Sequence, residues 1–185
     1  MMGWRDTLTP QEITDLQALE AQLREGYDER LEYHRRAIIA RGHARQTALN
    51  RRKKNMIENM TDLEAATYHG IKAAQRLAHK TATEAGWYTD PHTGEPIVRN
   101  FGEVVALMHS ELSEALEADR KGLNDDKLTH RDGREVEFAD CIIRILDTCA
   151  ALGLDVAGAI IEKNRYNRDR ADHKLANRAA GGKRY

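Results

Sequence analysis

The chain has 185 residues, a net charge of −1 and 41% hydrophobic residues, which is enough for one folded domain with an appendage. The near-zero net charge excludes a protein that binds nucleic acid through its overall charge, and the lack of an apolar run of about 20 residues excludes a membrane span. With 32% charged residues and only three prolines, the composition favours an all-α fold.

The sequence predicts a cytoplasmic location, which is the host cytoplasm if a phage encodes the protein. The first residues, MMGWRDTLTPQE, lack the apolar segment of a secretory signal. Cys141 and Cys149 fall in one predicted helix, where their separation of about 12 Å is too large for a disulfide. They are predicted to be buried, reduced thiols.

Residues 1–60 are predicted to form an N-terminal helical extension. Thr9-Pro10-Gln11-Glu12 has the pattern of a helix start, with Thr as the cap and Pro in the first turn. Residues 35–54 then contain eight Arg and Lys residues and no Asp or Glu. A solvated helix face is the favoured interpretation of this basic stretch, because it lacks the aromatic residues and the fold motif of a nucleic-acid-binding domain.

Three roles for residues 1–60 stay open. They could pack as an appendage on an oligomer, or bind nucleic acid through the basic stretch. They could also lie upstream of the true start of translation, at Met56 or Met60.

Residues 61–175 are predicted to form the main helical bundle. A capping pattern at Thr61 begins a helix that extends to residue 85, and Gly, Pro and Asp-Pro signals make 86–100 an ordered loop. Further helices are expected at 101–120, 134–152 and 155–172. Residues 176–185 are expected to be a disordered tail.

Glu111 stands on the apolar face of the 101–120 helix. Helical periodicity places it among Val104, Leu107, Met108, Leu112, Ala115, Leu116 and Ala118. Glu114 lies at the edge of this face, and Glu117 lies on the polar side. An unpaired carboxylate on a surface that faces the core costs several kcal/mol, so Glu111 requires a basic partner or a metal ion.

The 134–152 helix carries one polar strip, formed by Glu137, Asp140, Arg144, Asp147 and Thr148. One interpretation is a solvated face with an Asp140–Arg144 ion pair. Two neighbouring helices that each carry an acidic pair instead favour a hard cation such as Mg²⁺, which binds several carboxylate oxygens. The rest of this helix is so apolar that it predicts a homo-oligomer.

Lys163, Asn167 and Arg170 share one face of the last predicted helix. An ammonium, an amide and a guanidinium together suit the oxygens of a phosphate group. The alternative is a basic helix end that is favoured by the helix dipole.

Together these segments resemble the all-α nucleoside triphosphate pyrophosphohydrolases, the MazG-like superfamily that includes dCTP pyrophosphatases and dimeric dUTPases, with phage and bacterial members. The family motifs are E-E-x-x-E, E-x-x-D and K-x-x-x-N-x-x-R. The chain has S-E-L-S-E at 110–114, E-F-A-D at 137–140 and K-N-R-Y-N-R-D-R at 163–170. The resemblance covers residues 62–173. It departs from the family at Ser110, where the first Glu is expected, which puts the number of bound metal ions in question.

The resemblance implies a MazG-like four-helix core that cleaves a nucleoside triphosphate between its α- and β-phosphates, giving a monophosphate and pyrophosphate. Glu111, Glu114, Glu137 and Asp140 would hold Mg²⁺, for which Mn²⁺ can substitute. Lys163, Asn167 and Arg170 would bind the triphosphate, and the enzyme would be a homodimer or homotetramer.

Trp87, Tyr88 and Asn100, in the loop before the first motif helix, are candidates for contact with the base. Two other functions stay open. One is a helical nucleic-acid-binding protein that uses residues 35–54. The other is a nucleotide-binding or sensing protein that has lost catalysis because of Ser110.

Overall fold

The computed structural model describes residues 3–26, 28–171 and 174–179. These residues form helices joined by loops, with two isolated β-bridges and no β-strand, which confirms the all-α fold class. No helix in these ranges is both long enough and apolar enough to pass through a membrane. The chain divides into two compact units, Met1–Thr61 and Asp62–Tyr185.

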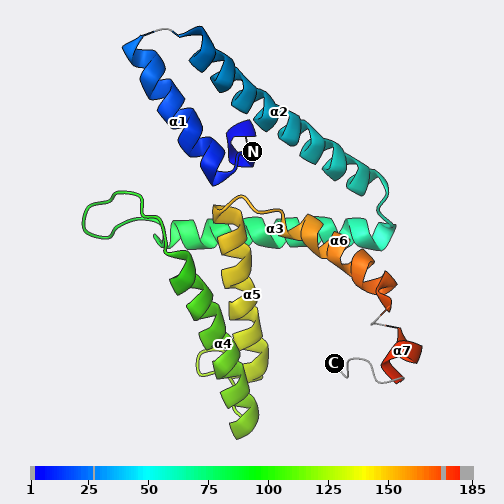
Figure 1. Cartoon of the computed structure of the whole chain (residues 1–185). Helices are drawn as coiled ribbons and strands as arrows, with labels where there is room; N and C mark the ends of the chain where they lie inside the picture. Colours follow the sequence, from blue (N-terminus) through cyan, green and yellow to red (C-terminus); the bar gives the residue numbers. More distant parts are fainter. Residues whose placement is uncertain (1–2, 27, 172–173, 180–185) are drawn as a thin grey trace. The chain divides into compact units, whose positions relative to one another are not determined.

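The first unit is a helical hairpin. The short 3-10 helix η1 (Trp4–Thr7) precedes α1 (Pro10–Glu25) and α2 (Glu29–Glu58), as Figure 1 shows. Thr9 caps α1 as the sequence predicts, because its hydroxyl accepts a hydrogen bond from the Glu12 amide and the Glu12 carboxylate accepts one from the Thr9 amide. The hairpin core contains Leu8, Leu16 and Ile38, with Trp4, Leu19 and Ile39 packed against it.

The basic stretch 35–54 lies on α2, and the charge of its first half is partly offset within the hairpin. Arg35 and Arg36 bind the Glu32 carboxylate through their Nε atoms at 2.8 and 2.7 Å. Glu12 of α1 accepts hydrogen bonds from two further arginines of the stretch. This pairing reduces the positive charge that is available to a nucleic acid.

The second unit carries every motif of the resemblance. Its helices are α3 (Asp62–Glu84), α4 (Phe101–Lys121), α5 (Gly133–Ala151), α6 (Val156–Asp169) and α7 (Leu175–Ala179). In Figure 1, α4 and α5 form a hairpin that meets α3 towards its C-terminal end, and α6 lies along the N-terminal half of α3. Within the expected tail, residues 176–179 belong to α7, and residues 180–185 lie outside the described residues.

Two polar contacts fix the position of α6. The Arg165 guanidinium donates two hydrogen bonds to Glu64 of α3, at 2.8 and 2.7 Å. The buried Gln75 side chain donates to the Leu154 carbonyl at 3.1 Å and so holds the α5–α6 turn on α3. The α6 helix is therefore anchored to α3.

The core of the second unit consists mainly of small side chains. Its buried apolar residues are Tyr68, Ala78, Val104, Ala115, Ala118, Cys141, Ala157 and Ile161. Both cysteines are free thiols, although only Cys141 is buried and Cys149 is half-buried.

Gly133, the first residue of α5, permits the close approach of α4 and α5. A Cβ atom at this position would lie 2.9 Å from the Ala118 Cβ and 3.0 Å from the Leu123 carbonyl oxygen. Since backbone cannot move aside as a long side chain can, the helices would have to separate to admit a methyl group.

We therefore expect Gly133→Ala to lower the free energy of unfolding by about 1–3 kcal/mol. Gly70→Ala, within α3, is the matched control: a Cβ there meets nothing within 4 Å, so the variant should gain about 0.5–1 kcal/mol from helix propensity. Urea unfolding followed by circular dichroism measures both. Equal stability of the two variants would contradict the close α4–α5 contact.

Candidate metal centre

Three carboxylates from α4 and α5 converge in the second unit. Glu111, Glu137 and Asp140 each offer an oxygen, and these oxygens all lie within 4.8 Å of one another. Glu111 is buried, Glu137 is half-buried and Asp140 is exposed, so the cluster reaches from the helix interface to the surface. Burial of Glu111 agrees with its predicted place on the apolar face.

Arg144 supplies the positive charge next to the buried carboxylate. Its Nε donates to Glu111 Oε1 at 2.7 Å. The sequence suggested an Asp140–Arg144 pair along one helix, but the ion pair crosses between helices instead. Glu111 needs compensation more than Asp140 does, because a buried charge loses more hydration than an exposed one.

Burial, together with neighbouring negative charge, raises the pKa values of Glu137 and Asp140. The pKa of Glu137 is raised to about 7 by burial, by the charge of Glu114 and by a hydrogen bond shared with Glu111. The pKa of Asp140 is also raised, by burial and by the charge of Glu111. A divalent cation would relieve this repulsion, and carboxylate oxygens are the ligands that Mg²⁺ prefers, so the donor set fits such an ion.

The remaining residues of the first motif lie at the margin of the cluster. Glu114 is exposed and stands outside the group of three, although its charge reaches Glu137. The Ser110 hydroxyl donates to the Leu107 carbonyl of its own helix at 2.8 Å. Ser110 is therefore engaged by its own backbone, which agrees with its predicted place away from the centre of the site.

The predicted phosphate-binding residues are grouped around Tyr166 on α6. Lys163 Nζ lies 4.8 Å from the centre of the Tyr166 ring, and the Arg170 guanidinium carbon lies 5.7 Å from it. Asn167 has a buried Oδ1 atom without a hydrogen-bond partner among the described residues. Lys163 and Asn167 lie on α6, which packs on α3, and Arg170 follows the end of α6 at Asp169, whereas the acids lie on α4 and α5.

The three candidates for contact with the base differ in their surroundings, and Tyr88 is half-buried, with its hydroxyl donating to Asp147. The Trp87 side chain is exposed in the loop between α3 and α4. Asn100 caps α4, where its Oδ1 accepts a hydrogen bond from the Glu103 amide. The Asn100 side-chain oxygen therefore serves as the N-cap of α4.

A second buried carboxylate, Asp147, was not predicted as a site residue. Asp147 Oδ1 accepts from the Tyr88 hydroxyl and contacts His79 Nδ1, both at 2.8 Å, and Arg99 lies 3.6 Å from Oδ2. Burial and the Asp147 charge raise the pKa of Tyr88 to about 12. This network ties both ends of the 85–100 loop to α3 and α5, and so holds the loop that carries Trp87.

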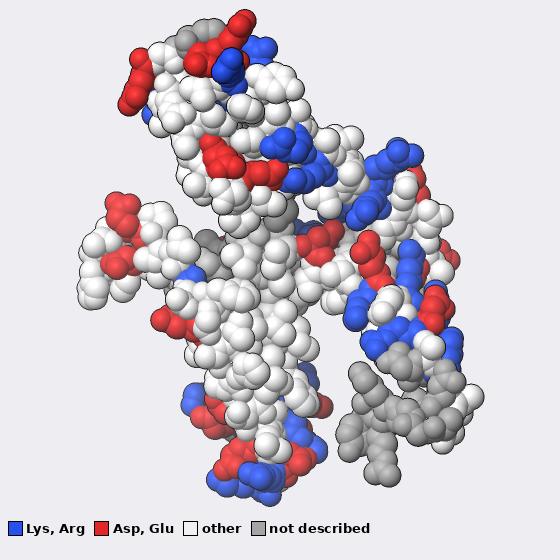
Figure 2. Space-filling model, in the orientation of Figure 1, with Lys and Arg blue, Asp and Glu red and all other residues white. Residues whose placement is uncertain are grey.

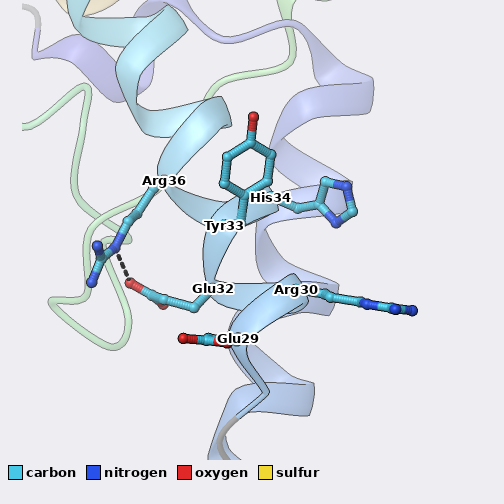
Figure 3. A pocket seen from close by; sticks show the side chains of 6 residues that line it. All are labelled: Glu29, Arg30, Glu32, Tyr33, His34 and Arg36. Carbon is cyan, nitrogen blue, oxygen red and sulfur yellow. Dashed lines mark hydrogen bonds and ion pairs between the residues drawn. The ribbon is translucent and has the colours of Figure 1, made fainter.

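A surface hollow at the start of α2 is not a comparable site. Figure 3 shows that its lining side chains come from a single helix and point in different directions. They are Glu29, Arg30, Glu32, Tyr33, His34 and Arg36. The one ion pair drawn there joins Glu32 to Arg36, and no set of like groups converges on the hollow.

No protein-family model, curated protein or solved structure matches this chain.

The raised pKa of Glu137 predicts a pH-dependent stability. Between about pH 4.5 and 7 the unfolded chain has lost this proton and the folded chain retains it, so this group makes stability fall as pH rises. In the presence of a chelator, Glu137→Gln should therefore gain stability relative to wild type across this window. The gain should reach about 1–3 kcal/mol at pH 8, less than the full pKa change would give because a half-buried group is partly screened.

Urea unfolding of both proteins from pH 4 to pH 8 measures this difference. Glu135→Gln is the control, because Glu135 is exposed on the same helix and pairs with Arg131 at the surface. The free energy of unfolding of this control should depend on pH in the same way as that of the wild type. A constant difference between Glu137→Gln and wild type at every pH would contradict the crowded cluster.

Proposed function

We propose that the protein is a Mg²⁺-dependent nucleoside triphosphate pyrophosphohydrolase of the MazG-like class. It would convert a nucleoside or deoxynucleoside triphosphate and water to the monophosphate and pyrophosphate. The observation that carries the proposal is the convergence of Glu111, Glu137 and Asp140 from two helices, in the order and spacing of the family motifs. Arg144 balances only one of these three carboxylates, so the group still favours a divalent cation.

Different residues of the chain would bind the metal ion, orient the water and bind the phosphates. Glu111, Glu137 and Asp140 would hold the ion, and Mg²⁺ in that place would offset the charge of the phosphate oxygens and make water more acidic. Glu114 stands exposed beside the group and is the carboxylate available to orient the attacking water. Lys163, Asn167 and Arg170 would bind the triphosphate by charge and hydrogen bonding.

The hairpin of α4 and α5 supports assembly into a homo-oligomer. Its exposed apolar side chains are Leu107, Leu112, Leu116, Phe138, Ile142 and Ile143. In Figure 2, the visible face of this hairpin is largely free of charged residues except near its lower end. Exposed apolar surface on this scale is typical of an interface, and the small-residue core of the unit leaves these side chains without cover.

A pyrophosphate-release screen over canonical and modified nucleoside triphosphates tests the function. We expect turnover of at least one substrate with Mg²⁺ and none in excess EDTA, because the acids alone repel a triphosphate. Asp140→Asn should reduce turnover by about 100-fold or more, since one charged ligand is lost. Asp126→Asn, at an exposed Asp paired with Lys127, should behave as wild type.

Full turnover in EDTA, or wild-type rates in Asp140→Asn, would show that the cluster is a solvated face. Mg²⁺-dependent binding of a nucleotide without turnover would favour a nucleotide sensor over an enzyme.

The apolar face gives a separate prediction. Ile142→Glu should dissociate the oligomer to monomers, because a carboxylate would be buried at the interface without a partner. Leu63→Glu, at an exposed Leu in the first turn of α3, is the control and should leave the mass unchanged. Light scattering after size-exclusion chromatography measures both, and a monomeric wild type would refute the interface.

A further inference from the structure

Arg144 occupies a position that neither the motifs nor the proposed function assign. Its side chain is 37% exposed, whereas that of its partner Glu111 is 8% exposed. The guanidinium therefore bonds to a buried carboxylate at one edge and is open to solvent elsewhere. Arg144 also follows Asp140 by one turn of α5.

The hydrogen bonding of Arg144 is incomplete. Nε donates to Glu111, but the structure gives the two terminal nitrogens no hydrogen-bond partner within the described ranges of the chain. A guanidinium has five N–H donors in a planar fork that matches the oxygens of carboxylate and phosphate. Most of the donors of this arginine are thus open to solvent or to a ligand.

The charges of the cluster explain why an arginine lies there. When ionised, three carboxylates and one guanidinium leave a charge of −2, which one divalent cation would balance. Arg144 and such a cation would both be drawn to Glu111 and would repel each other. The arginine therefore stabilises the buried carboxylate and at the same time weakens the binding of a cation.

Resting on the proposed function, we infer that Arg144 is an exchangeable counter-charge that becomes a phosphate ligand. It neutralises Glu111 until a divalent cation binds the carboxylates. The released guanidinium then donates to the phosphate oxygens of the substrate, on the solvent-facing side of the site.

This role predicts that replacing Arg144 raises the affinity for Mn²⁺ and lowers the affinity for tripolyphosphate. Arg144→Gln should bind Mn²⁺ alone about 3–10-fold more tightly, because a like charge near the ion is removed. With Mn²⁺ saturating, the same variant should bind inorganic tripolyphosphate at least about 10-fold more weakly, because a charge-assisted hydrogen bond is lost. If Arg144 only stabilised the fold, its replacement would weaken the binding of both Mn²⁺ and tripolyphosphate.

The experiment measures free Mn²⁺ by electron paramagnetic resonance in a titration of the full chain, and tripolyphosphate binding by calorimetry. Arg144→Lys, a second variant that retains the charge, should keep the wild-type affinity for Mn²⁺ and lose part of the affinity for tripolyphosphate. Arg134→Gln is the matched control, because Arg134 lies on the same helix and pairs with Asp119 and Asp132 at the surface. It should change neither affinity.

Weaker Mn²⁺ binding by Arg144→Gln, or unchanged tripolyphosphate binding, would overturn the role of Arg144 and leave the proposed function standing. A wild type that binds no Mn²⁺ would overturn the metal centre and this inference together. Neither arm requires turnover, so a protein that binds Mn²⁺ without hydrolysing nucleotides still tests the inference.

Discussion

The negative charge of Glu111, buried between α4 and α5, is the constraint on which the rest of the site depends. A carboxylate in that position must be compensated, and the structure does so with Arg144 from the facing helix at 2.7 Å. The same compensation brings the polar strip of α5 towards α4, which places Glu137 and Asp140 beside Glu111. The close packing at Gly133 allows this approach. One ion pair thus links the geometry of the hairpin to the chemistry of the cluster.

Much of this arrangement could be predicted from the sequence, because helical periodicity determines which residues share a face. It places Glu111 on an apolar face and Glu137, Asp140 and Arg144 on one polar strip, and the capping pattern at Thr9 locates the start of α1. The partner of Arg144 could not be predicted. Periodicity orders residues on one helix but does not show which charge across the interface is buried more deeply. Arg144 pairs with Glu111 and not with Asp140 because Glu111 is buried more deeply.

The Asp147 network shows a second limit. His79, Tyr88 and Arg99 meet Asp147 only because the 85–100 loop returns to α3 and α5, and no local pattern records the path of a loop. Likewise, spacing predicts one helical face for Lys163, Asn167 and Arg170, but α6 ends at Asp169 and Arg170 follows it in extended backbone. The core of the second unit is built mainly from small residues, and several large apolar side chains of α4 and α5 are exposed.

The most direct test of the metal centre is anomalous diffraction from crystals of the full chain grown with Mn²⁺. The account predicts an anomalous peak in contact with carboxylate oxygens of Glu111 on α4 and of Glu137 and Asp140 on α5. Crystals that contain Mn²⁺ elsewhere, or none, while Arg144 still binds Glu111 would contradict it. That result would make the cluster a structural ion-pair network and leave the proposed hydrolase without its central feature.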